Sequence, residues 1–191
     1  MKDICVFCSS SEDLSEDYYI LADELGVLLG KNKMDLIHGA GTIGLMGVLM
    51  KSAAAAGCFV TGVVPERLNR KNIVSDKLQK LVITTDMKDR KEYMRSHSDA
   101  FIALPGGFGT LEELLETITL KQLKYHSKPI IILNHKGFYD KLLEQLEVFY
   151  NEDFANPSYR ELYFVAKTST EAIDYIKKYV PKNIYDKYLG A

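Results

Sequence analysis

The stretch "DAFIALPGGFGTLEELLE", residues 99–116, joins a short apolar run to a glycine-rich turn and then to a helical pattern. The run 99–107 predicts a buried strand, and the periodicity after the turn predicts a helix over 110–124. Glycine turns between a strand and a helix usually serve anionic ligands, yet Glu112 and Glu113 stand at the start of this helix. The stretch therefore predicts a strand–turn–helix unit and raises the question of which anion tolerates carboxylates nearby.

The same alternation of strand and helix extends along the chain. Continuously apolar runs predict parallel strands covered on both faces, and they lie at 3–8, 34–39, 58–65, 80–85, 99–107, 128–134 and 162–166. Helical patterns separate them, at 16–30, 44–56, 86–98, 110–124, 137–149 and 169–180. This order predicts an α/β fold, a single-domain Rossmann-like doubly wound parallel sheet flanked by helices. We expect the domain to span 1–181, with an appended tail over 182–191.

Composition narrows the classes of partner. The chain has 191 residues, is 47% hydrophobic and 26% charged, and carries a formal net charge of -2, so it lacks a broad basic field for nucleic acid. We expect a cytoplasmic protein without membrane contact, because no signal-peptide pattern and no apolar run of about 18 to 20 residues occurs. Three cysteines fit a reducing compartment. Cys5 and Cys8 stand at i and i+3 of a strand and should point to opposite faces, which argues against a redox or metal pair.

A second glycine turn follows another predicted strand. The segment "HGAGTIGLMG", residues 38–47, places Gly39, Gly41 and Gly44 in G-x-G-x-x-G spacing at a helix start. Such a turn lets backbone amides approach a phosphate. A tight turn without any ligand explains the spacing too. A nicotinamide-dependent oxidoreductase would want an acid at the end of the next strand, and Glu66 comes only after Pro65.

The helix after 109 also allows two interpretations. Thr110 and Glu113 have the T-x-x-E spacing of a capping box, which would need no ligand. The stripe expected to face the sheet holds four apolar residues, Leu111, Leu114, Leu115 and Ile118. Glu113 should then point away from the core, together with Thr117 and Leu120. We expect that face to meet a second subunit.

Basic residues stand at the start of another helix, in "DMKDRKEYM", residues 86–94. Arg90 and Lys91 flank the apolar line of Met87 and Met94, so they should point inward or along the buried stripe. The planar guanidinium of arginine suits bidentate recognition of phosphate or carboxylate. The alternative is an i,i+4 surface pair between Arg90 and Asp86.

Other residues give weaker signals. His38 ends a strand before the glycine turn and could contact a ligand or form a hydrogen-bonded part of the core. Ser9 and Ser10 are placed to donate hydrogen bonds at the end of the first strand. The remaining histidines show no metal-ligand spacing, so no metal site is expected. Nothing singles out a Schiff-base lysine for pyridoxal phosphate.

Four segments in order, "ICVFCSSS", "GTIGLMG", "DMKDRKEYM" and "PGGFGTLEE", resemble the LONELY GUY (LOG) family of cytokinin-activating nucleoside 5'-monophosphate phosphoribohydrolases. The resemblance runs from about residue 3 to 135. It implies a Rossmann-like fold, a homodimer, no cofactor, and hydrolysis of the N-glycosidic bond of a nucleoside 5'-monophosphate to free base and ribose 5-phosphate.

The resemblance also implies roles for particular residues. Arg90 and Glu113 match the catalytic pair, and the matching substrate positions are Lys91, Gly107, Phe108, Gly109, Thr110, Glu112 and Thr119. Three departures from the family pattern, Ser9, Ala40 and Lys88, leave the pair intact and leave base preference open. Gly39, Gly41, Gly44 and Ser9 are further candidates from the strand-end argument.

A nucleotide ligand would explain why glutamates stand beside a glycine turn that is suited to an anion. Its phosphate can take the glycine amides, while its ribose develops positive charge as the base departs, as in glycoside hydrolysis. We expect Glu113 to stabilise that charge and orient water, Arg90 to anchor the ribose or phosphate, and Glu112 to bind ribose hydroxyls or the base. No metal or redox cofactor is required. The main alternative is a non-catalytic nucleotide-binding or carrier module on the same fold.

Overall fold

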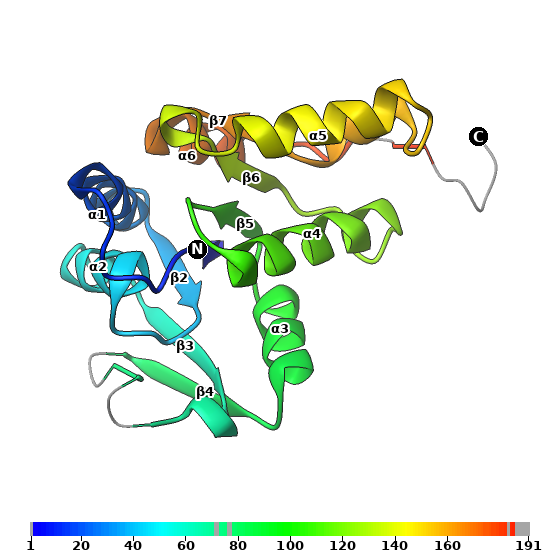
Figure 1. Ribbon diagram of the computed structural model, residues 1–191. Helices are drawn as coiled ribbons and strands as arrows, with labels where there is room; N and C mark the ends of the chain where they lie inside the picture. Colours follow the sequence, from blue (N-terminus) through cyan, green and yellow to red (C-terminus); the bar gives the residue numbers. More distant parts are fainter. Residues whose placement is uncertain (1, 71–72, 76–77, 183, 186–191) are drawn as a thin grey trace.

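The computed structural model describes residues 2–70, 73–75, 78–182 and 184–185 and shows one parallel sheet of seven strands in the order β4-β3-β2-β1-β5-β6-β7 (Figure 1). The strands are β1 (Lys2–Phe7), β2 (Met34–His38), β3 (Val60–Pro65), β4 (Lys80–Thr84), β5 (Ala100–Ala103), β6 (Ile130–Leu133) and β7 (Phe164–Ala166). Every neighbouring pair is parallel. The predicted doubly wound α/β sheet is confirmed.

Helices cover both faces of the sheet (Figure 1). One face carries α1 (Glu16–Lys31), α2 (Gly44–Ala55) and α6 (Ser169–Lys178); the other carries α3 (Met87–Ser96), α4 (Phe108–Gln122) and α5 (Asp140–Asn151). All six were predicted from the helical patterns between the strands. Three short 3-10 helices were not predicted, and they are η1 (Glu66–Leu68), η2 (His135–Gly137) and η3 (Pro157–Leu162). They are too short to produce a periodic signal.

The alternation of side chains along β1 divides the core into two. Ile4 and Val6 pack with α1 and α2, whereas Cys5 and Phe7 pack on the opposite face with α3 and α4. Cys8 joins the first group, so Cys5 and Cys8 point to opposite faces as predicted, and all three cysteines are free. Burying each large apolar side chain contributes roughly 1.5 to 3 kcal/mol.

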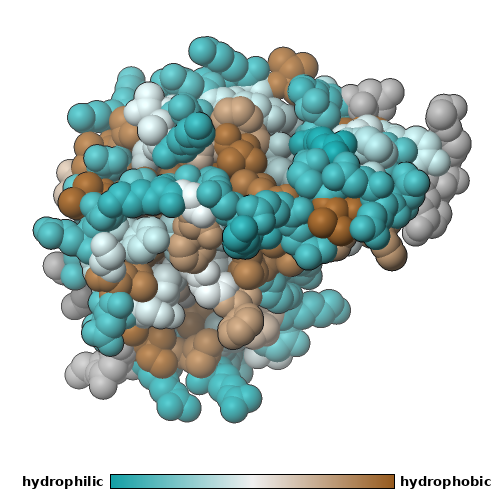
Figure 2. Space-filling view, turned by 45° about the horizontal axis from the view of Figure 1, so that its top comes forward, coloured by the Kyte–Doolittle hydropathy of each residue, from teal (hydrophilic) through white to brown (hydrophobic). Residues whose placement is uncertain are grey.

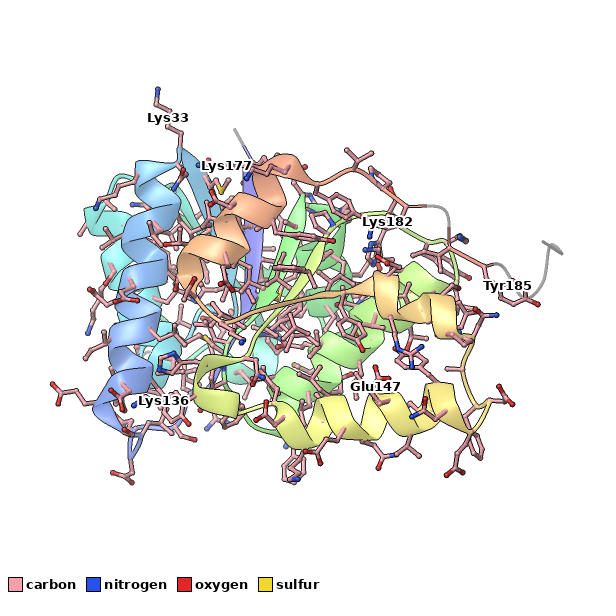
Figure 3. All side chains as sticks on the ribbon, turned by 90° about the horizontal axis from the view of Figure 1, so that it is seen from above. Lys33, Lys136, Glu147, Lys177, Lys182 and Tyr185 are labelled. Atoms are coloured by element: carbon pink, nitrogen blue, oxygen red, sulfur yellow. The ribbon has the colours of Figure 1, made fainter. Side chains whose placement is uncertain are left out.

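The strand order reverses between β1 and β5, and this places the functional end of the sheet. In doubly wound folds ligands bind beyond the carboxyl ends of the strands at such a point. Figure 3 shows the two ends of the molecule, with Lys33 after α1 at the amino edge and Lys136 after β6 at the carboxyl edge. The segments following β1, β2, β3 and β5 therefore converge at one edge.

A small third cluster holds the last described residues against the domain. Ile184 is buried with Leu146, Tyr150 and Leu162, which belong to α5 and η3. Lys182 forms an ion pair with Glu161. The rest of the predicted tail, 183 and 186–191, lies outside the described residues, and the boundary at 181 stays a prediction.

The surface matches the composition. Figure 2 shows hydrophilic side chains over much of one face, with apolar side chains gathered in patches between them. In the described part of the chain, no helix is both long and apolar enough to cross a membrane.

Candidate active site

The start of α4 differs from the capping-box interpretation. The helix begins at Phe108 with Gly107 as N-cap, so Thr110 is the third helical residue rather than the cap. Thr110 is buried against Gly106, and no side chain caps the helix among the described residues. The backbone N–H groups of the first turn are left to other partners, and the helix dipole adds partial positive charge there.

The predicted orientation of α4 was only partly right. Leu114 is buried and Leu111 and Ile118 pack beside it as predicted, whereas Leu115 is exposed. The buried face also includes Thr110, Thr117 and Lys121, which were not predicted there. The Thr117 hydroxyl donates to the Glu113 carbonyl at 2.7 Å, and Lys121 Nζ donates to the Leu162 carbonyl at 2.8 Å.

Glu113 consequently points at α3 and not away from the molecule. Arg90 Nη1 donates to Glu113 Oε1 at 2.6 Å, and the two side chains are only 9% and 11% exposed. Arg90 Nε also donates to the Val63 carbonyl at 3.1 Å, at the end of β3. The alternative pair with Asp86 is excluded, because the Asp86 side chain caps α3 through the amide of Asp89.

Electrostatics distinguish the two ionisable groups next to Arg90. Burial raises the pKa of Glu113, while the charge of Arg90 and its hydrogen bond oppose that rise. Burial and then the Arg90 charge lower the pKa of His38 to about 3, so its imidazole is neutral. Neither ring nitrogen of His38 has a hydrogen-bond partner among the described residues, so His38 is a core histidine but not the hydrogen-bonded one expected.

Arg90 and Glu113 line a cleft of about 550 Å³ at the carboxyl edge of the sheet. Many of its lining residues were predicted from the sequence, and they include Ser9, Arg90, Gly107, Phe108, Gly109, Thr110 and Glu113. Gly39 and Gly41 also line the cleft. A Cβ atom added at Gly107 or Gly109 would meet nothing within 4 Å, so these glycines face open space at the helix start.

A second group of lining residues is apolar and was not predicted. Its members come from the start of α2, the end of β3, η1, the following loop and the start of α3, and they are Ile43, Met46, Val64, Pro65, Leu68, Ile73 and Met87. Met87 is 45% exposed, although it was expected on a buried line with Met94. These residues come from predicted strands, helices and loops alike, so no single sequence pattern marks them.

Four predicted substrate residues do not line the cleft. Gly44 is buried at the start of α2, and Thr119 lies further along α4, where its hydroxyl donates to the Leu115 carbonyl. Lys91 forms ion pairs with Glu112 and, at 3.0 Å, with Glu116. Lys91 and Glu112 therefore link α3 to α4 beside the cleft.

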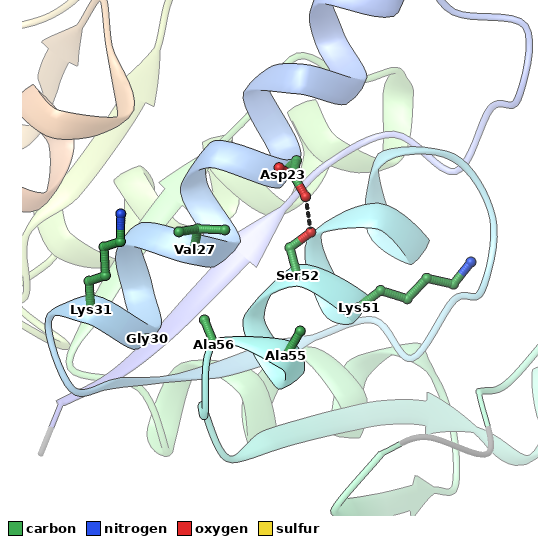
Figure 4. Close-up of a pocket in the computed structure, with 8 residues that line it drawn as sticks. All are labelled: Asp23, Val27, Gly30, Lys31, Lys51, Ser52, Ala55 and Ala56. Carbon is green, nitrogen blue, oxygen red and sulfur yellow. Dashed lines mark hydrogen bonds between the residues drawn. The ribbon is translucent and has the colours of Figure 1, made fainter.

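A second hollow, of about 620 Å³, lies between α1 and α2 (Figure 4). Ser52 donates a hydrogen bond to Asp23 across it, and small residues such as Gly30 and Ala56 form its floor. It contains none of the candidate residues, which leaves the cleft at the carboxyl edge as the candidate site.

Fold and cleft together define a class: a doubly wound α/β protein with an anion-suited helix start facing a buried Arg–Glu pair. Residues 46–176 match a family model described as "Possible lysine decarboxylase". A pyridoxal-phosphate decarboxylase needs a lysine for its Schiff base, and no lysine is among the described residues lining the cleft.

Relatives whose names state their activity identify the family of this chain. The chain is 42% identical over 182 residues to cytokinin riboside 5'-monophosphate phosphoribohydrolase LOG1 of Arabidopsis thaliana, covering 95% of this chain and 85% of the relative. LOG3 of the same plant is 41% identical over 178 residues, covering 93% and 83%. The chain belongs to this LOG family, as its motifs predicted.

Solved structures share the architecture at lower identity. The molybdenum cofactor (Moco) carrier protein of Chlamydomonas reinhardtii superposes with a TM-score of 0.70 at 24% identity, covering 93% of this chain and 96% of that one. The molybdenum cofactor binding protein of Rippkaea orientalis gives the same values. At this identity the likeness establishes the fold alone.

Proposed function

We propose that the protein hydrolyses the N-glycosidic bond of a nucleoside 5'-monophosphate, releasing free base and ribose 5-phosphate. The observation that carries the proposal is the Arg90–Glu113 pair, which is nearly buried yet lines the same cleft as the open glycines of the α4 start. Membership of the LOG family supports it, because relatives at 41–42% identity are named for this reaction.

The proposed mechanism assigns a role to each part of the cleft. The phosphate binds the backbone amides around Gly107 and Gly109, where a helix dipole favours negative charge. The anomeric carbon then lies toward Glu113, whose carboxylate stabilises the oxocarbenium-like transition state and orients the attacking water. Arg90 keeps that carboxylate in place and offers its remaining N–H groups to the ribose or phosphate.

The mixed lining of the cleft supports different binding places for the parts of the substrate. Phosphate and ribose bind at Arg90, Glu113 and the glycine turn, and the base binds against apolar lining residues such as Leu68, Ile73 and Met87. An apolar substituent on the base would remove those exposed side chains from water, at roughly 25 cal/mol per Å². This favours a cytokinin riboside monophosphate over plain adenosine monophosphate.

Chromatography of free base after incubation with a panel of nucleoside monophosphates tests the activity. We expect release by the wild type and loss of release in Arg90→Ala and Glu113→Gln. Equal cleavage of a nucleoside and its monophosphate would contradict the phosphate subsite. Nucleotide binding without release from any substrate would establish the carrier alternative instead.

We also propose a homodimer. The predicted face of Thr117 and Leu120 does not support it, because Thr117 is buried within its own chain. The support is the family resemblance together with exposed apolar side chains on α4 and at its C-cap: Phe108 is 95% exposed, and Leu115 and Leu123 are each 39% exposed. Light scattering at micromolar concentration should give twice the mass of one chain, and a monomer would remove the proposal.

The cytoplasm is the proposed compartment, and nucleic acid and membranes are not among the proposed partners. Three free cysteines and a net charge of -2 support this assignment. Fractionation of cells that express the protein tests it, and recovery with membranes or with oxidised cysteines would contradict it.

A further inference from the structure

The guanidinium of Arg90 is confined on three sides. Nε donates to the Val63 carbonyl at 3.1 Å, and Nη1 donates to Glu113 at 2.6 Å. The remaining nitrogen, Nη2, lies against Gly39 at the end of β2: a Cβ atom added to Gly39 would be 2.4 Å from Nη2 and 3.6 Å from Cζ. Heavy atoms do not approach this closely, so the guanidinium occupies the space that any other residue at position 39 would fill.

Backbone geometry does not explain this glycine. Gly39 is not among the glycines with positive φ, so its conformation is open to other residues. The other neighbour of the added Cβ atom is Met46 Sδ at 3.1 Å, the flexible part of a thioether side chain. The contact that excludes a side chain at position 39 is therefore the one with Arg90.

We propose that Gly39 is a positioning residue for Arg90. The proposal rests on the function proposed above, in which Arg90 and Glu113 carry the reaction. A methyl group at position 39 displaces the guanidinium, which then cannot keep both its bond to Val63 and its bond to Glu113. The fold itself loses little, because the clashing atom is the end of a long side chain. A misplacement of about 1 Å in a catalytic group can cost about 10²-fold in rate.

This role differs from the phosphate-binding role that the glycine motif suggests. If Gly39 only let its backbone approach a phosphate, Gly39→Ala would raise KM and leave kcat unchanged. If Gly39 positions Arg90, kcat falls. The turn contains a matched comparison, because a Cβ atom on Gly41 would lie 2.9 Å from Met46 Sδ and its nearest neighbours do not include Arg90.

The pH profile gives a second readout that loss of stability would not move. Glu113 is faced by Arg90 and Lys91 from α3, by Glu112 from its own helix, and by the buried thiols of Cys5 and Cys8 from β1. Because Arg90 holds the pKa of Glu113 below the value that burial alone would give, displacing the guanidinium raises that pKa. The acid limb of kcat in Gly39→Ala therefore moves to higher pH.

The experiment is a double-mutant cycle on release of free base. We expect Gly39→Ala to lower kcat by about 10²-fold in the wild-type background and to have almost no further effect beside Arg90→Lys, which lacks Nη2. Gly41→Ala should have the same effect in both backgrounds. Equal effects of Gly39→Ala in both backgrounds, or an unshifted acid limb, would overturn the proposal. Wild-type turnover in Arg90→Lys and Arg90→Ala would instead remove the catalytic role of Arg90 itself.

Thermal melting keeps the test valid if Gly39→Ala folds poorly. Any loss of Tm in Gly39→Ala should disappear when it is combined with Arg90→Ala, because that change removes the clashing atoms. An undiminished loss of Tm in the double variant would show that Gly39 packs against something other than Arg90, and the proposal would fail.

Discussion

The turn after β2 and the turn after β5 have similar glycine patterns, but their glycines face different surroundings. After β2, Gly39 meets Arg90, Gly41 meets Met46, and a Cβ atom on Gly44 would lie 2.5 Å from the Ser11 carbonyl oxygen. After β5, Gly106 meets Thr110, but an added Cβ atom at Gly107 or Gly109 meets nothing within 4 Å. The glycines of the first turn face atoms of the protein itself, whereas Gly107 and Gly109 of the second are open to a ligand.

This difference teaches that a glycine motif specifies an absence of side chains and not what occupies the space. In the first turn, Arg90, Met46 and the neighbouring serine loop occupy the space beside the glycines. In the second turn, the space beside Gly107 and Gly109 is part of the cleft. Substitutions at the two turns should therefore have different and partly opposite consequences.

The largest effect is expected on activity, at Arg90 and Glu113, which line the cleft together with residues of both turns. Glu113→Gln should lower kcat by about 10² to 10³, because it removes the preorganised charge that stabilises the sugar cation. The matched control is Glu116→Gln, one turn further along α4 and outside the cleft, where Glu116 pairs with Lys91 and Arg95. Steady-state release of free base decides the matter: similar rates for the two variants would assign catalysis to another residue.

The second-largest effect is expected on stability, at Gly44 in the turn after β2. Gly44 has φ of +60°, and its missing side chain lies against backbone atoms of Ser10 and Ser11. Gly44→Ala should lower the free energy of unfolding by about 1 to 3 kcal/mol through backbone strain, with added cost from the clash. Urea denaturation measures it. An unchanged midpoint would mean that the serine loop moves freely, contrary to a filled first turn.

A pH effect should also belong to the first turn, because His38 directly precedes it. The pKa of His38 is lowered to about 3 in the folded state, against about 6.5 when unfolded. Between these values the unfolded chain binds a proton that the folded protein does not, so stability falls as pH decreases, by up to about 1.4 kcal/mol per pH unit.

Urea midpoints from pH 7 to pH 4 should therefore fall less steeply in His38→Phe than in wild type. Some slope should remain, because burial also lowers the pKa of His126 to about 4. Identical slopes in the two proteins would show that His38 is not kept neutral by its surroundings.

The smallest effect has the opposite sign and belongs to the second turn. Gly109 lies in the first turn of α4 with open space around it, so Gly109→Ala should raise the free energy of unfolding by up to about 1 kcal/mol through helix propensity. The same methyl group intrudes on the phosphate subsite, so KM should rise. Greater stability with an unchanged KM would place the phosphate elsewhere.

Much of the fold could be predicted from local pattern. The strands and helices follow from apolar runs and helical periodicity, and the opposite directions of Cys5 and Cys8 follow from the pleat of a strand. The orientation of α4 could be predicted only in part, because its buried face also uses Thr110, Thr117 and Lys121. Thr117 and Lys121 can be buried there because each donates a hydrogen bond to a backbone carbonyl.

By itself the sequence determined the order of strands and helices, the family, and the residue types gathered at the carboxyl edge, because these depend on neighbours along the chain. Only the tertiary structure decided that Glu113 points at Arg90, that Lys91 and Glu112 bridge two helices beside the cleft, and that apolar side chains line the same cleft as the pair. Those contacts join residues that are distant in sequence and depend on how each helix is rotated about its axis.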